Sequence, residues 1–175
     1  MLNKGITCFM KKISLLLFCV ALSILFGFSQ ALPSVTLKDI NGKMVDTSEL
    51  SNDGKPFIIS FFATWCKPCL RELNAINEVY AEWQEETGVR LIAISVDQAQ
   101  NMNRVKPLVD RLDWDYEVLL DPNSDFTRAL NINSSLIPAV LIIDGKGNIV
   151  ERRTGYTDGS EEHLIEKVRE LLGGN

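Results

Sequence analysis

The sequence is poor in the residues that most metal sites and nucleic-acid interfaces need. It has one histidine, His163, and four cysteines in 175 residues, and its 18 lysines and arginines are outnumbered by 23 aspartates and glutamates. A zinc site needs a cluster of histidine and cysteine ligands, and nucleic-acid binding needs a basic surface. The basic residues are scattered and form no stripe. We therefore expect no metal, no cofactor and no nucleic-acid partner.

The N-terminal segment lacks acidic residues, since none occurs before Asp39. Three lysines precede an apolar run at 13–28, and small residues follow at 29–31. This order predicts a secretory signal, residues 1–31, that is cleaved after Ala31 and leaves one domain at 32–175. The run is close to the length that spans a bilayer, so an uncleaved anchor is the alternative. Either way we expect a periplasmic or otherwise exported domain that touches the membrane only through this segment.

Cys66 and Cys69 are the only cysteines of the predicted domain, because Cys8 and Cys19 lie in the targeting segment. A structural disulfide closing so short a loop would stabilise the fold weakly. The pair follows an apolar run at 57–62 and opens an amphipathic pattern, which places Cys66 at a helix N-terminus and Cys69 one turn later on the same face. Backbone N–H groups and the helix dipole there should lower the pKa of Cys66 below about 8.5. The pair is therefore predicted to be redox-active.

Strand and helix patterns alternate along the predicted domain. This order indicates an α/β sandwich with a mixed sheet, in which parallel crossovers come early and an antiparallel pair comes late. The expected elements are a hairpin at 35–45 with an Asn41-Gly42 turn, a strand at 57–62, a helix at 67–86 ended by Gly88, a strand at 89–96, a helix at 101–112, a strand at 116–120, a short helix to 130 capped by Ser124, a hairpin of strands at 139–143 and 148–152, and a final helix to 172 capped by Ser160.

A family resemblance lies in the segment Phe61-Phe-Ala-Thr-Trp-Cys-Lys-Pro-Cys-Leu-Arg-Glu72. It resembles the active-site segment of thioredoxin-fold proteins, particularly the exported TlpA/ResA-like thiol–disulfide oxidoreductases related to the AhpC/TSA family. The N-terminal hairpin and a βα insertion between about Asp97 and Leu136 also fit this branch. The resemblance implies a thioredoxin-like sandwich, with a mixed central β-sheet flanked by helices.

The same resemblance implies an activity, a protein disulfide reductase. Cys66 would be the nucleophile and Cys69 the resolving thiol, and together they would form the redox-active disulfide. Substrates would be protein disulfides or dithiols. A membrane thiol donor would supply electrons, and relatives commonly serve cytochrome c maturation.

Five further residues are implied to form the substrate-binding surface. Trp65 would shield the cysteines and dock substrate, or else pack in the core. Lys67 would add a positive charge near the thiolate, or else be an ordinary exposed residue. Pro68 would keep the first turn rigid at a position where its missing N–H is no loss. Ile137-Pro138 matches a cis-proline that faces the disulfide and pairs with extended substrate, although sequence alone favours a trans bond.

Glu72 lies one turn past Cys69, at the edge of the apolar face of the predicted helix. A carboxylate there would be partly desolvated, with a raised pKa, and could exchange a proton with Cys69. The alternative is a surface glutamate. The matching position is a functional glutamate in the family resembled. Ser60 stands where thioredoxin has a buried aspartate and cannot accept a proton near neutral pH, so Glu72 is expected to take that role.

Two other functions on the same fold remain as alternatives. A copper-binding or metallochaperone module would use a wider cysteine spacing and a converging histidine, whereas His163 lies in the first turn of the predicted last helix beside two glutamates. In a peroxiredoxin the reactive cysteine follows a threonine or serine by three positions and a proline by seven. Ala63 and Ile59 occupy those positions before Cys66. Whether the pair acts as reductant or oxidant stays open at this stage.

Overall fold

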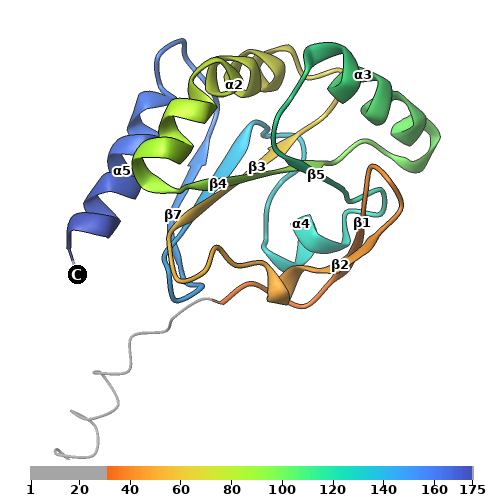
Figure 1. The fold of residues 1–175 in the computed structure, drawn as a ribbon. Helices are drawn as coiled ribbons and strands as arrows, with labels where there is room; N and C mark the ends of the chain where they lie inside the picture. The colour runs from red at the N-terminus through yellow and green to blue at the C-terminus, as the bar shows by residue number, and fades with distance from the viewer. Residues whose placement is uncertain (1–30, 175) are drawn as a thin grey trace, which may run out of the picture.

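The computed structural model describes residues 31–174, so the predicted signal segment lies outside the described residues apart from Ala31. The chain forms one seven-stranded mixed sheet in the order β2-β1-β5-β4-β3-β6-β7 (Figure 1). Its strands are β1 Thr36–Asp39, β2 Met44–Asp46, β3 Phe57–Phe62, β4 Arg90–Ser95, β5 Glu117–Leu120, β6 Ala139–Ile143 and β7 Ile149–Thr154. The helices are the 3-10 segments η1 Thr47–Glu49 and η2 Ala99–Arg104, and the α-helices α2 Lys67–Thr87, α3 Val105–Leu112, α4 Asp125–Ala129 and α5 Glu162–Gly173. The predicted α/β class with a mixed sheet is confirmed.

Strand β3 is the centre of the core, and all six of its residues are buried. Helices α2, α3 and α5 lie over one face of the sheet and α4 over the other (Figure 1). Successive side chains of a strand point to opposite faces. Phe61 accordingly packs against Phe126 of α4, while Phe62 packs edge-on against Trp114, which follows α3. Coverage on both faces explains why the strand is apolar without alternation.

The directions of the strands bring three distant segments to one edge of the sheet. β3 pairs in parallel with β4, so Phe62 lies opposite Ser95, and antiparallel with β6, so Phe61 lies opposite Ala139. The end of β3, the end of β4 and the start of β6 therefore meet. The residues that follow β3 include both cysteines, and Pro138 directly precedes β6.

Helix α2 begins directly after Cys66 and ends at Gly88, as predicted. Its buried side chains recur at helical spacing and include Leu73, Ile76 and Tyr80. Gly88 adopts the left-handed conformation with φ of 68°, which ends helices at low steric cost when the residue is glycine. This helix buries an apolar stripe against the sheet and presents its N-terminus at the edge where the three segments meet.

The helix expected at 101–112 is divided in the structure. A 3-10 segment, η2, covers Ala99–Arg104, and regular α-helix starts only at Val105. Pro107 explains the division, because it has no N–H to donate to the carbonyl of the fourth residue before it. A start at Val105 places this proline in the first turn, where no such bond is needed.

Two predicted helix caps are wrong. Ser124 makes no capping bond; instead the buried carboxylate of Asp121 accepts the backbone N–H groups of Asp125, Phe126 and Thr127. An aspartate can reach several N–H groups at once because both of its oxygens accept.

Ser160 does not cap the last helix either, since α5 begins at Glu162 after Glu161. The Ser160 hydroxyl accepts the backbone N–H of Thr157 and closes the preceding turn.

The described chain begins against the sheet. Ala31 forms an isolated antiparallel bridge with Asn148, and Leu32 is buried in the core. A domain that starts at Leu32 would keep this packing and lose the bridge. Among residues 31–174, no helix has the length and apolar character required to cross a bilayer.

Candidate functional site

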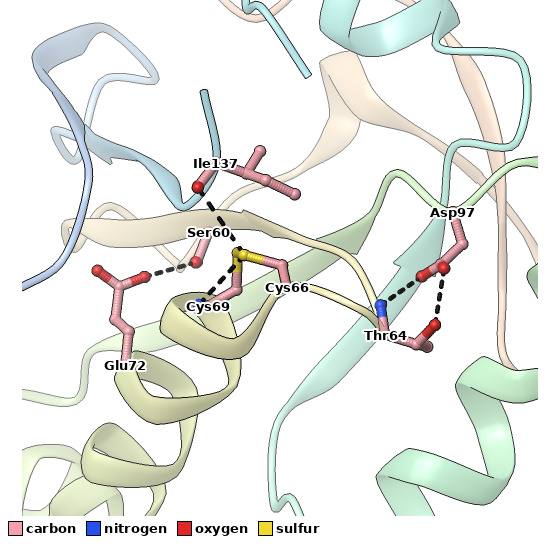
Figure 2. Close-up of a disulfide and its surroundings, with 7 residues drawn as sticks. All are labelled: Ser60, Thr64, Cys66, Cys69, Glu72, Asp97 and Ile137. Atoms are coloured by element: carbon pink, nitrogen blue, oxygen red, sulfur yellow. Dashed lines mark hydrogen bonds between the residues drawn. A yellow bond between two sulfur atoms is a disulfide. The ribbon is translucent and has the colours of Figure 1, made fainter. Parts of the chain in front are cut away.

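Cys66 and Cys69 form a disulfide at the start of α2 (Figure 2). Cys66 is the N-cap residue, and the backbone N–H of Cys69 donates to its sulfur at 3.3 Å. N–H groups at a helix N-terminus have no partner within the helix, and they stabilise negative charge placed on them. The structure therefore favours a thiolate at Cys66 when the disulfide is open.

The two cysteines differ in accessibility. Cys66 keeps 4% of its surface exposed, whereas Cys69 keeps none. Thiol–disulfide exchange requires a thiolate to reach the sulfur that it attacks. Cys66 is therefore the more accessible of the two cysteines to an external thiol or disulfide.

The peptide bond between Ile137 and Pro138 is cis, as the resemblance implied. The carbonyl oxygen of Ile137 lies 3.8 Å from the Cys66 sulfur (Figure 2). A disulfide sulfur has no proton, so this is a contact in the oxidised protein, and the reduced thiol could donate to the same oxygen. The Pro138 carbonyl accepts the backbone N–H of Gly155, which ties the segment to the chain after β7.

An exposed apolar residue directly precedes each of the two segments that meet at the disulfide, Cys66 and Ile137. Trp65 is 62% exposed and Leu136 is 59% exposed, so the core-packing alternative for Trp65 is wrong. Lys67 is exposed, and Pro68 occupies the first turn of α2. Large apolar side chains gathered at one exposed place indicate an interaction surface.

Glu72 is buried, at 4% exposure, so the surface alternative is wrong. Its carboxylate accepts a hydrogen bond of 3.2 Å from the Ser60 hydroxyl (Figure 2). Burial raises the pKa of Glu72 to about 7, against the opposing effects of the Ser60 hydrogen bond and the Arg153 charge; Glu161 adds a small upward effect. A group that titrates at neutral pH beside a redox pair is suited to proton transfer.

The contact between Ser60 and Glu72 was not predicted, because sequence comparison with thioredoxin marks Ser60 only as the loss of an aspartate. Ser60 lies on β3 and holds the carboxylate that replaces that acid. The available signal was the spacing, since a strand that runs beneath α2 must present one of its faces to the helix.

Asp97 was not predicted as a site residue. It is fully buried and accepts the backbone N–H and the hydroxyl of Thr64, both at 2.8 Å (Figure 2). The Ser95 hydroxyl also donates to it at 2.9 Å. Asp97 thus joins the end of β4 to the loop that carries Trp65 and Cys66. An acidic residue directly after a buried strand was the available signal.

His163 is half-exposed on α5, and its Nε2 lies 2.8 Å from a carboxylate oxygen of Glu151 on β7. Among the described residues, no group of three or more histidine, cysteine, aspartate and glutamate side chains is arranged to hold a metal ion.

Comparison with known proteins gives a consistent result. A model of the AhpC/TSA family matches residues 28–152. The chain is 29% identical over 137 residues to thiol-disulfide oxidoreductase ResA of a Bacillus cereus strain, covering 78% of this chain and 75% of the relative. ResA of Bacillus subtilis (strain 168) is 28% identical, covering 75% and 69%.

Solved structures agree with this fold. An uncharacterized thioredoxin-like protein from Porphyromonas gingivalis is 64% identical, with a TM-score of 0.72 over 82% of this chain and 93% of that one. A putative thiol:disulfide interchange protein DsbE from Chlorobium tepidum, at 21% identity, has a TM-score of 0.70 over 83% and 97%. The second likeness concerns the fold alone.

The raised pKa of Glu72 predicts a pH-dependent cost of folding. In the unfolded chain the carboxyl group has its ordinary pKa of 4.5, and in the folded protein its pKa is about 7. The folded state thus binds more protons between these values, and stability falls as pH rises through this window. The oxidised protein should lose about 2–3 kcal/mol relative to Glu72→Gln between about pH 5 and pH 8.

Urea unfolding of the oxidised proteins at the two pH values measures this difference. Glu78→Gln, an exposed change on the same helix, is the matched control and should follow the wild type. A wild-type protein whose stability runs parallel to that of Glu72→Gln would contradict the assignment.

Proposed function

The chain belongs to the AhpC/TSA family and is a thiol–disulfide oxidoreductase, and on this premise we propose that it is an exported protein disulfide reductase with Cys66 as its nucleophile. The observation that carries the proposal is the disulfide between a slightly exposed cysteine at a helix N-terminus and a fully buried one. The first is suited to attack an outside disulfide. The second is placed to finish the reaction internally.

The reaction proceeds by two exchanges. The Cys66 thiolate attacks one sulfur of a substrate disulfide, which forms a mixed disulfide and releases the other substrate sulfur as a thiolate. Cys69, as a thiolate, then attacks the Cys66 sulfur, which releases the second substrate thiolate and leaves the Cys66–Cys69 disulfide. The substrate gains two electrons, and the protein loses them. A thiol donor must then reduce the protein disulfide by the reverse steps.

Glu72 is proposed to take up the proton that Cys69 must lose before the second exchange. It lies one turn past Cys69 on α2, in the dry region beneath the disulfide, and its Ser60 hydrogen bond fixes one carboxylate oxygen (Figure 2). A pKa of about 7 allows it to accept and release a proton near neutral pH.

The substrate is proposed to dock across the exposed surface at this edge of the sheet. Trp65 and Leu136 supply apolar contact, and the backbone around Ile137 and Pro138 faces the disulfide. An extended substrate segment laid beside a backbone strand gains main-chain hydrogen bonds. Lys67 is exposed next to Cys66 and adds positive charge near the thiolate.

Export is supported by the N-terminal sequence, with three lysines followed by an apolar run at 13–28. The segment is proposed to be cleaved after Ala31 or, if retained, to anchor the domain in the inner membrane. In the periplasm the Cys66–Cys69 disulfide would be reduced by a membrane thiol donor, because no soluble reductant buffer keeps thiols reduced there.

The two cysteines should behave differently when each is replaced. Cys69→Ser retains the nucleophile but removes the resolving thiol, so it should accumulate mixed disulfides with protein substrates. Cys66→Ser retains only the buried thiol and should trap none. Non-reducing electrophoresis after acid quenching measures the adducts. A Cys66→Ser variant that traps as much as Cys69→Ser would reverse the assignment, and no adduct with either would exclude the exchange mechanism.

Removing the Glu72 carboxylate should slow the second exchange. In Glu72→Gln the decay of the mixed disulfide is expected to be slower by about tenfold or more, with loss of the inflection near pH 7. Rapid acid quenching of reduced protein mixed with a peptide disulfide gives the rate at each pH. Glu78→Gln is again the control, and an unchanged pH profile in Glu72→Gln would remove Glu72 from the mechanism.

The direction of the reaction can be tested by the reduction potential of the Cys66–Cys69 pair. A reductase should equilibrate near the potential of thioredoxin, about −270 mV, because its dithiol must be a strong donor. Equilibration with glutathione and dithiothreitol buffers, read by alkylation of free thiols, gives the value. A potential near −120 mV would instead make the protein an oxidant.

A further inference from the structure

A groove of about 560 Å³ lies beside the active-site loop, between Trp65 and helix α3. Thr64 and Trp65 form part of its lining, while Arg104, Leu108 and Arg111 line it from η2 and α3. Because Trp65 immediately precedes Cys66, anything bound to the reactive cysteine lies next to this groove. Apart from Trp65, its lining residues have no part in the proposed mechanism.

The two arginines of the groove are exposed, and no carboxylate among residues 31–174 forms an ion pair with either of them. Lys106, on the same helix, differs, since it pairs with Asp110 at 3.3 Å. The groove therefore presents two guanidinium groups that form no ion pair within the described domain. Guanidinium groups bind carboxylates through paired hydrogen bonds.

The loop that lines the groove next to the cysteines is held by hydrogen bonds. The Thr64 backbone and hydroxyl are both bonded to the buried Asp97 carboxylate, which fixes the loop that carries Trp65. A binding surface that is already ordered loses less entropy when a partner arrives. The backbone of the loop that carries Trp65 is therefore held in place before a substrate binds.

Trp65 also lines a second hollow, which has a different character. That hollow, of about 320 Å³, is lined by uncharged residues, which are Val96, Gln98, Asn101, Ser124, Ser134 and Ser135 together with Trp65 itself. Of the two hollows that Trp65 lines, only the one beside α3 has charged side chains in its lining.

We propose that this groove selects protein substrates that carry acidic side chains close to their reactive cysteine. These side chains would lie on the part of the substrate that extends from Cys66 past Trp65 toward α3. The proposal rests on the proposed reductase function. The whole chain has a net charge of −5, so an acidic partner would otherwise be repelled. Arg104 and Arg111 provide a local region of opposite sign, which favours the encounter and fixes the orientation of the substrate.

The test compares two peptide disulfides of identical sequence except for aspartates or lysines beside the cysteine. Each is mixed with protein that has been reduced and freed of reductant, so that only the Cys66–Cys69 dithiol supplies electrons. The proteins are the wild type, the double variant Arg104→Gln with Arg111→Gln, and the control Lys106→Gln. The control removes one positive charge from α3 at a residue that does not line the groove. Bis(2-hydroxyethyl) disulfide, which is uncharged, reports the chemistry without the groove.

The wild type and Lys106→Gln should reduce the acidic peptide about fivefold or more faster than the basic one at low salt, and high salt should weaken this preference. The double variant should lose the preference and still reduce the uncharged disulfide at the wild-type rate. A wild type without preference, or a preference that persists in the double variant, would overturn the proposal.

Failure of the reductase function would have a different signature, because the uncharged disulfide would then not be reduced by any of the proteins. In that case, titration with the same peptides carrying serine in place of cysteine decides the question of the groove. Tighter binding of the acidic peptide to the wild type than to the double variant would support it. Equal binding would refute it.

Discussion

The pairing of β3 with one parallel and one antiparallel neighbour is the constraint on which the site depends. Parallel pairing places the end of β4 beside the end of β3, and antiparallel pairing places the start of β6 there as well. Asp97, Cys66 and Pro138 are far apart in the sequence and meet only because of these directions. The apolar burial of β3 on both faces stabilises the arrangement, so the hydrophobic core and the reactive edge have the same origin.

Local signals were sufficient to predict most of the elements and the two cysteines. The apolar run of β3, the helical spacing in α2 and the Gly88 stop each depend on residues near one another. Contacts between distant segments could not be predicted in this way. To predict the hydrogen bond between Ser60 and Glu72, one must know which face of β3 lies under α2. To predict the hydrogen bonds from Thr64 to Asp97, one must know that β4 ends beside Thr64.

The incorrect caps have a related cause. A serine before an apolar run satisfies the general preference for an N-cap, but the bond depends on local backbone geometry. Ser124 has a φ of 58°, in the left-handed region, and the carboxylate of Asp121 already occupies the N–H groups of α4. The division between η2 and α3 has a similar cause, because the position of Pro107, and not the spacing of apolar residues, determines where the α-helix begins. Periodicity locates a helix better than it locates its first residue.

The unequal burial of the two sulfurs has a consequence for how the protein handles electrons. In the proposed mechanism, the sulfur of Cys66 is the atom that bonds to each substrate, and Cys69 already lies within disulfide-bonding distance of it. Attack by Cys69 on such an adduct would be intramolecular, with a high effective concentration, so it would compete well with attack by other thiols. The buried position of Cys69 would thus limit how long a substrate stays covalently bound, in addition to completing the transfer of two electrons.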